Sequence, residues 1–263
     1  MNTIKPRGGS KMPFIDSHAH LSAPPLIDQA EEILQRAKQN HISSIVNICT
    51  DASSLEKGLL LSKRHPWVYN AAAVTPHDVA KEGKTFLPLI RKHTSELVAI
   101  GETGLDYYYE HSPRDLQQEY LLHHFALAHE AKLPIIFHCR NAFEDLFSMA
   151  DSHLKNTSAI LHCFTGTMDE AKKCLDRGWL VSISGIVTFK KSVPLQEVVR
   201  FIPLDQLLIE TDAPYLAPQS KRGKLNEPGY LPETAAFIAH LKGISVEEVA
   251  DATAKNARDF FSL

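Results

Sequence analysis

Short apolar runs alternate with segments of helical periodicity along almost the whole chain. The runs are brief, rich in β-branched residues and nearly all apolar, which is typical of parallel strands that are covered on both faces. The expected strands are residues 14–20, 44–49, 68–74, 97–101, 135–138, 159–163, 180–184 and 207–209. The expected helices are residues 27–40, 53–64, 86–94, 114–131, 142–152, 168–177, 195–201, 231–242 and 246–263.

The helical segments carry signals of their own. Leu116, Tyr120 and Leu127 recur at helical spacing in the segment 114–131, and Ser245-Val-Glu-Glu248 has the form of a capping box. Strand–helix alternation implies parallel pairing with right-handed crossovers. Eight such units within 263 residues favour one closed (β/α)8 barrel over an open doubly wound sheet.

Side chains that bind metals follow five of the apolar runs, always at the same end. The runs are Phe14-Ile-Asp-Ser-His18-Ala-His20, Val98-Ala-Ile-Gly-Glu102, Pro134-Ile-Ile-Phe-His138, Ala159-Ile-Leu-His162 and Leu207-Leu-Ile-Glu-Thr-Asp212. Imidazoles and carboxylates are the ligands that divalent transition metals take from proteins. Since the carboxyl ends of parallel strands meet at one face of a barrel, we expect a metal centre at that face.

Strand alternation predicts which of these side chains point into the barrel. His18 and His20 lie two residues apart and therefore emerge on the same side, which Phe14 and Asp16 are expected to share.

The two later histidines are each followed by a cysteine. His138 and His162 are expected to point inward together, and alternation places Cys139 and Cys163 on the opposite face, against the helices. The two thiols are therefore interpreted as core residues rather than ligands.

Six residues form the candidate ligand set. They are His18, His20, Glu102, His138, His162 and Asp212. Six ligands suit two ions, which Glu102 could bridge with its two carboxylate oxygens. A divalent ion lowers the pKa of bound water from about 15.7 to about 7, and two ions roughly 3.5–4 Å apart stabilise both the attacking and the leaving oxygen. Four imidazoles are compatible with Zn²⁺, Mn²⁺ or Co²⁺, whereas Mg²⁺ prefers more oxygen ligands.

Two carboxylates are the candidate catalytic residues. Asp212 is placed to bind metal and to accept a proton from metal-bound water, and Glu102 bridges the ions. Glu210, two residues before Asp212, shares its inward direction. It could orient a metal-binding side chain by hydrogen bonding without binding the metal itself.

Composition and charge add little to this picture. The chain is 44% hydrophobic and 22% charged, with a formal net charge of -3, which neither indicates nor excludes nucleic-acid binding through a local basic patch. Its 4 cysteines show no C-x-x-C spacing, which argues against a zinc site built from thiolates. Its N-terminus lacks a secretory signal, and no apolar run reaches the roughly 20 residues of a membrane span. We expect a cytoplasmic protein with no obligate protein partner, built as a short flexible segment, residues 1–12, followed by one domain, residues 13–263.

Several motifs in order resemble the TatD family of metal-dependent hydrolases, within the amidohydrolase superfamily. They are Asp16-Ser-His18-Ala-His20, Gly101-Glu-Thr-Gly-Leu-Asp-Tyr-Tyr108, His138-Cys-Arg140, His162-Cys-Phe-Thr-Gly166, Glu210-Thr-Asp212-Ala-Pro-Tyr215 and Arg222-Gly-Lys-Leu-Asn226-Glu-Pro228. The resemblance covers the chain from Pro13 to its C-terminus. It implies a TIM barrel with a dinuclear site and a DNase or related phosphodiester hydrolase activity.

The resemblance also implies how the ligands are divided between two ions. By match to the family pattern, one ion is held by His18, His20, Glu102 and Asp212. The other is held by Glu102, His138 and His162.

The chain departs from the family pattern at two places. The family often has Gly-x-His-Pro-His after the third strand, where this chain reads Ala73-Val-Thr75-Pro-His77, so Thr75 replaces the first of those histidines while His77 remains. The family's His-x-Arg-Asp reads His138-Cys-Arg140-Asn141 here, which is a milder change.

Candidate substrate contacts come from the loops expected at the barrel mouth. Arg140, Arg222 and Lys224 could meet phosphate oxygens, and His77 is a further candidate. Tyr215 and the tyrosines at 107–109 could stack on bases.

Three functions are compatible with this sequence. The first is a divalent-metal-dependent deoxyribonuclease that uses two ions (Zn, Mn, Co or Mg) and metal-activated water. Within this class, an exonuclease is the favoured interpretation. The second is an amidohydrolase that cleaves a small-molecule ester, lactone or amide, or that deacylates aminoacyl-tRNA. The third is a binding protein that retains the barrel without activity, and the intact ligand set argues against it.

Overall fold

The computed structural model describes residues 14–154 and 156–263 and shows the expected (β/α)8 barrel. Eight parallel strands pair in chain order. They are β1 (Phe14–Ala19), β2 (Ile42–Cys49), β3 (Val68–Ala72), β4 (Leu97–Asp106), β5 (Ile135–Arg140), β6 (Ala159–Leu161), β7 (Leu180–Ile183) and β8 (Leu207–Ile209). The N-terminal segment expected over residues 1–12 lies outside the described residues.

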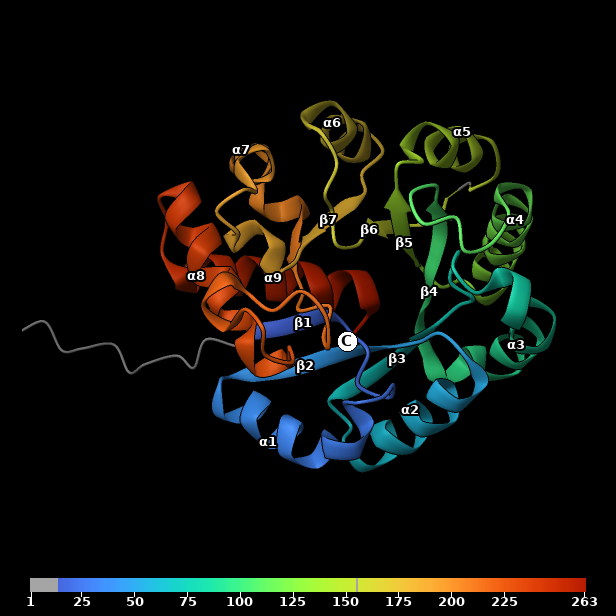
Figure 1. Ribbon diagram of the computed structural model, residues 1–263, viewed down its shortest axis with the longest axis horizontal. Coiled ribbons are helices and arrows are strands. Elements are labelled where there is room, and N and C mark those ends of the chain that lie inside the picture. The colour runs from blue at the N-terminus through green and yellow to red at the C-terminus, as the bar shows by residue number, and fades with distance from the viewer. Residues whose placement is uncertain (1–13, 155) are drawn as a thin grey trace, which may run out of the picture.

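Helices surround the strands on all sides (Figure 1). They are α1 (Ala30–Gln39), α2 (Ala52–Arg64), α3 (Val79–His93), α4 (Arg114–Ala131), α5 (Phe143–His153), α6 (Met168–Asp176), α7 (Val193–Phe201), α8 (Leu231–Lys242) and α9 (Val246–Phe261). Within the described part of the chain, no helix has the length and hydropathy needed to cross a bilayer.

The expected boundaries of α4, α8 and β8 are confirmed, and so is the capping box of Ser245 and Glu248 at the start of α9. Two elements exceed their expected bounds by the largest margins. Helix α3 begins at Val79 rather than near residue 86. Before Phe86 only Val79 and Gly83 are buried, so the apolar pattern that marks a helix is weak in these turns. Strand β4 runs on to Asp106 instead of ending at Gly101.

The core has two layers. The larger lies between the strands and the surrounding helices, and the smaller fills the barrel. The interior cluster consists of Ile15, Val46, Ile48, Ala71, Ala99, Ile136, Ile160 and Leu208 together with Ala254, Ala257 and Phe261. The last three belong to α9, which therefore closes the end of the barrel opposite the ligand-bearing strand ends (Figure 1).

Register irregularities redirect two of the strands. Between Asp16 and Ala19, β1 carries one residue more than its partner β2, and between Ile100 and Thr103, β4 carries one more than β5. An extra residue reverses the side-chain direction of everything after it. Phe14 consequently packs in the outer layer, and the expectation that it shares the inward side of His18 is wrong.

The barrel closes through residues near the ends of β1 and β8. The backbone N–H of His20 donates to the carbonyl of Ala213 over 2.7 Å, and the N–H of Asp212 donates to the carbonyl of His18 over 2.9 Å. Three of the candidate ligands therefore belong to the seam itself, so the position of each depends on the other strand.

Gly104 permits the close pairing of β4 and β5. Its φ is +146°, and a Cβ at this position would lie 1.9 Å from the carbonyl oxygen of His138. We expect Gly104→Ala to lower the free energy of unfolding in urea by about 1–3 kcal/mol beyond the cost of the backbone conformation alone. Gly178→Ala is the matched control, because Gly178 also has a positive φ but nothing within 4 Å of its Cβ position. Equal losses in the two variants would contradict this account.

His124 of α4 is fully buried and links two strand ends. Its Nε2 accepts from the backbone N–H of Val74, its Nδ1 lies 2.9 Å from Thr103 Oγ1, and burial lowers its pKa from 6.5 to about 3. The unfolded chain therefore binds a proton below pH 6.5 that the folded chain takes up only near pH 3, so stability falls as the pH falls through this window.

The effect of His124 can be isolated by comparing pH profiles. Between pH 7 and pH 5 this group should remove about 2 kcal/mol of stability from the wild type. We expect His124→Gln to show a correspondingly smaller change over the same interval in urea unfolding, although it is less stable at pH 7. Parallel profiles for the two proteins would show that His124 is not neutral in the folded state.

Candidate metal centre

Glu102 lies at the centre of the mouth of the barrel, among four imidazoles. Its Oε2 is 2.8 Å from His18 Nε2, 3.6 Å from His20 Nε2 and 3.6 Å from His162 Nε2. Its Oε1 is 3.9 Å from His138 Nδ1. All five side chains belong to strands or to the residues directly after them, and the barrel brings them to one face.

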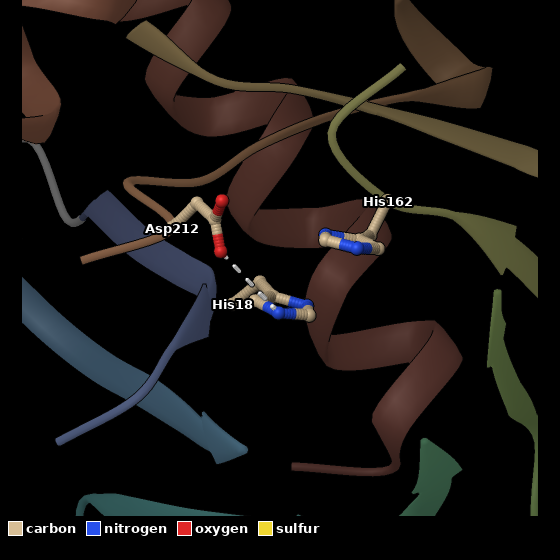
Figure 2. Close-up of side chains that lie close together, drawn as sticks. All are labelled: His18, His162 and Asp212. Atoms are coloured by element: carbon tan, nitrogen blue, oxygen red, sulfur yellow. Dashed lines mark ion pairs between the residues drawn. The ribbon is translucent and has the colours of Figure 1, made fainter. Parts of the chain in front are cut away.

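Asp212 joins this cluster from the segment after β8. Its Oδ1 is 3.7 Å from His18 Nε2 and 3.4 Å from His20 Nε2. Figure 2 shows Asp212, His18 and His162 converging, with the two rings stacked at a centroid distance of 3.9 Å. The six candidate ligands thus lie together, in overlapping groups whose ligand atoms are all within 4.8 Å of one another.

The cluster holds its carboxylates ionised. Burial alone would raise the pKa of Glu102, but His162 and His18 outweigh it and hold the pKa well below its usual range. The pKa of Asp212 is likewise lowered, against burial, by its hydrogen bond with His20 and by the neighbouring imidazoles. The pKa of His162 is raised to about 9, because the charges of Glu102 and Glu210 outweigh the effect of burial.

The donors at this site fit a divalent metal. His18 Nε2 and Glu102 Oε2 are buried and, among the described residues, make no hydrogen bond of ordinary geometry although they lie 2.8 Å apart. Buried polar atoms without hydrogen bonds are costly, and a cation between imidazole nitrogens and carboxylate oxygens removes that cost.

Glu210 supports His162 from behind. It is fully buried, and its Oε1 lies 3.3 Å from His162 Nδ1, on the side of the ring away from Glu102. A carboxylate on the second nitrogen fixes the tautomer and orientation of a metal-binding imidazole.

Asp106 has the same relation to His138, and sequence reasoning missed it. Its Oδ2 lies 2.9 Å from His138 Nε2 and 3.6 Å from His77 Nε2. Burial would raise the pKa of Asp106, but the hydrogen bond with His138 outweighs it and lowers the pKa to about 2. The signal was present in the sequence, since Asp106 ends a strand as the other site residues do, but β4 was expected to end earlier at Gly101.

The cluster of candidate ligands forms one wall of a cavity of about 720 Å³. Of the candidate substrate residues, the structure brings Arg140, His77, Tyr109 and Tyr215 into its lining. Thr75 also lines the cavity, and its hydroxyl donates to Asp78 Oδ2.

Two predicted phosphate contacts do not lie in this cavity. Lys224 lines a separate depression beside α1, and the guanidinium of Arg222 lies 5.1 Å from the ring of Phe189. The cause is the course of the loop after β8, which the side chain of Asn226 ties back to the carbonyls of Thr211 and Tyr215.

The two cysteines beside the histidines both line the cavity. Cys139 also packs in the outer core, where it was expected. Cys163 was expected against the helices, but β6 ends at Leu161 and the backbone of Cys163 turns to a φ of 43°. Burial raises the pKa of the Cys163 thiol well above its usual range, so it stays protonated.

Comparison with known proteins shows the family of the chain. The family model described as TatD related DNase matches residues 15–262. The chain is 38% identical over 253 residues to the uncharacterized metal-dependent hydrolase YabD of Bacillus subtilis, covering 95% of this chain and 99% of that protein. It is 35% identical over 259 residues to a protein of Erwinia tasmaniensis named 3'-5' ssDNA/RNA exonuclease TatD, covering 95% and 100%.

A solved structure matches over the same length. The crystal structure of YJJV, a TatD homologue from Escherichia coli K12, superposes with a TM-score of 0.89 at 28% identity and covers 95% of this chain and 98% of that one. The family match spans the barrel and all six clustered candidate ligands, and the chain belongs to the TatD family of metal-dependent hydrolases, enzymes that act on ester bonds.

Proposed function

We propose that this protein hydrolyses the phosphodiester bonds of DNA from a strand end, using two divalent ions. The observation that carries the proposal is that Glu102 belongs to two ligand groups, one with His18 and His20 and the other with His138 and His162. A shared carboxylate is the arrangement that holds two ions close enough to act on one phosphate. The printed name of the Erwinia relative, an exonuclease on single-stranded DNA and RNA, supports the same substrate class.

The proposed division of ligands extends the first of these groups by Asp212, whose Oδ1 lies 3.7 Å from His18 Nε2 and 3.4 Å from His20 Nε2. His18, His20, Glu102 and Asp212 would hold one ion, and Glu102, His138 and His162 the other. When bound, such ions lower the pKa of water and stabilise negative charge on phosphoryl oxygens. The imidazole-rich set favours Zn²⁺, Mn²⁺ or Co²⁺ over Mg²⁺.

The remaining groups handle the proton and the substrate. Asp212 has a lowered pKa and lines the cavity, so a carboxylate oxygen of Asp212 can accept the proton of the attacking water. Arg140 offers two parallel N–H groups to phosphate oxygens. His77, beside His138 and Asp106, can donate a further hydrogen bond to the substrate.

A second candidate function is hydrolysis of a small-molecule ester, lactone or amide, or deacylation of aminoacyl-tRNA. One observation favours it: among the described residues, Arg140 is the only lysine or arginine that lines the cavity. A neutral substrate would need no larger positive charge there.

Two substitutions test the assigned chemistry. We expect Asp212→Asn and Glu102→Gln to reduce hydrolysis of single-stranded DNA by about 10²–10⁴-fold, because the first removes the proton acceptor and the second the bridging charge. Glu56→Gln, at an exposed position of α2, is the matched control and should retain wild-type turnover. Circular dichroism establishes that each variant is folded. Wild-type rates in either site variant would overturn the assignment.

The substrate class is tested on the wild type. The metal-stripped enzyme is supplied with Mn²⁺, Mg²⁺ or Zn²⁺ and given single-stranded DNA, duplex DNA and a panel of esters and lactones. We expect metal-dependent release of nucleotides, fastest on single strands. Turnover of an ester without any release of nucleotides would move the second candidate function to first place.

The role of Asp106 is tested through metal affinity. We expect Asp106→Asn to raise the Kd of the ion held by His138 by about 10–100-fold, because the neutral amide no longer fixes that imidazole. Asp145→Asn is the control, since Asp145 accepts hydrogen bonds from Tyr107 and Gln118 away from the ligands. Isothermal titration of the metal-free proteins measures both. An unchanged isotherm for Asp106→Asn would show that Asp106 only positions the loop of Tyr108 and Tyr109 and does not support metal binding by His138.

A further inference from the structure

An exposed aromatic surface lies beside the metal cluster and has no role in holding it. We call it the aromatic shelf and define it by Tyr108, Tyr109 and His111, in the loop between β4 and α4. Tyr108 is 57% exposed and Tyr109 is 50% exposed, while the Tyr109 ring stacks on that of His111 at 5.3 Å with an interplanar angle of 9°. Large aromatic rings left half exposed at the rim of a functional cavity are a feature of binding surfaces.

The loop that carries the shelf is held in place. Asp106 Oδ1 accepts hydrogen bonds from the backbone N–H groups of Tyr108, at 3.0 Å, and Tyr109, at 2.8 Å. Ser112, at the other end of the loop, donates to the carbonyl of His77. A platform fixed in this way loses little conformational entropy when a ligand binds.

Arg140 stands over the shelf with its charge available. Its guanidinium lies 3.9 Å from the centroid of Tyr108 and 4.6 Å from that of Tyr109. Arg114, which follows the same loop, forms an ion pair with Glu110. Arg140, by contrast, has no ion-pair partner among residues 14–154 and 156–263.

The shelf leads directly to a proposed metal ligand. The ring of His77 lies 5.2 Å from that of His138 on one side and 5.8 Å from that of Tyr109 on the other. Tyr109, His77, His138 and Arg140 all line the cavity of about 720 Å³, which is large enough for a nucleotide. A nucleotide whose phosphate lies near His138 and Arg140 would therefore have its base within reach of the rings of the shelf.

From this arrangement we propose that the aromatic shelf binds an unpaired nucleobase next to the phosphodiester that is cleaved, with Tyr109 as the stacking ring. This rests on the proposed function. Bases in a duplex are covered by their neighbours on both faces, whereas those of a single strand can stack on protein side chains. Stacking on a ring tolerates any base, so the shelf selects single strands rather than a sequence.

The test measures binding, and it is independent of turnover. The full chain, loaded with Mn²⁺, is titrated with fluorescently labelled oligothymidylate whose linkages are hydrolysis-resistant phosphorothioates, and with an abasic strand of equal length and linkage. Stacking contributes about 1–3 kcal/mol per base, which corresponds to roughly 5- to 150-fold in Kd. We expect the wild type to prefer the base-bearing strand by a factor in this range.

Substitutions locate the effect. Tyr109→Ala should lose most of the preference by weakening the base-bearing strand, with the abasic strand unchanged, while Tyr109→Phe keeps the ring and the preference. Tyr230→Ala is the control, because Tyr230 lines the separate depression beside α1. Thermal unfolding shows whether each variant is folded. In the wild type, a fluorescent purine analogue near the strand end should lose emission on binding as it stacks.

Three results would overturn the proposal: equal affinity of the wild type for the two strands, wild-type preference in Tyr109→Ala, or unchanged emission of the purine analogue on binding. Each leaves the proposed phosphodiesterase activity intact, since that activity is judged by release of nucleotides from ordinary DNA. Failure of that release, with base-dependent binding retained, would instead remove the proposed function and leave the shelf as a nucleobase site.

Discussion

The mouth of this barrel depends on the contacts of one buried carboxylate, Glu102, with four imidazoles. A lone carboxylate in such a position would be neutral, because burial disfavours its charge. The surrounding histidines reverse that effect and keep Glu102 ionised, although the cluster still holds buried donors and acceptors with no hydrogen bonds of ordinary geometry. A site with this charge and these donors fits a divalent metal, in agreement with the metal-dependent hydrolases to which the chain is related.

The barrel and the site are not independent of each other. The sheet closes through backbone hydrogen bonds of His18, His20 and Asp212, so the seam of the barrel is also part of the candidate metal centre. On the opposite side, Asp106 contacts His138 through one oxygen and the backbone of Tyr108 and Tyr109 through the other. One carboxylate thereby links the proposed chemistry of the metals to the loop proposed to select the substrate.

Much of the site follows from local rules. Ile136, Ile160 and Leu208 point into the barrel, and His138, His162 and Glu210 lie two residues after them on the same faces. Regular alternation therefore directs these three correctly. His18 and Glu102 do not follow regular alternation. Counted from the inward residues Ile15 and Ala99, alternation would direct both side chains outward. Only the extra residues in β1 and β4 turn them into the barrel.

The sequence by itself determined the alternation of strands and helices, the face that bears the ligands and the ligand types, because apolar periodicity and the pleat of a strand are local properties of the chain. The tertiary structure decided the rest. The hydrogen bond of Asp106 with His138, the displacement of Arg222 and Lys224 from the cavity and the position of Arg140 over the aromatic shelf depend on contacts between segments that are distant in the sequence. Local residues can mark a candidate such as Asp106 at the end of a strand, but its partner is fixed only once the barrel has brought its loops to one face.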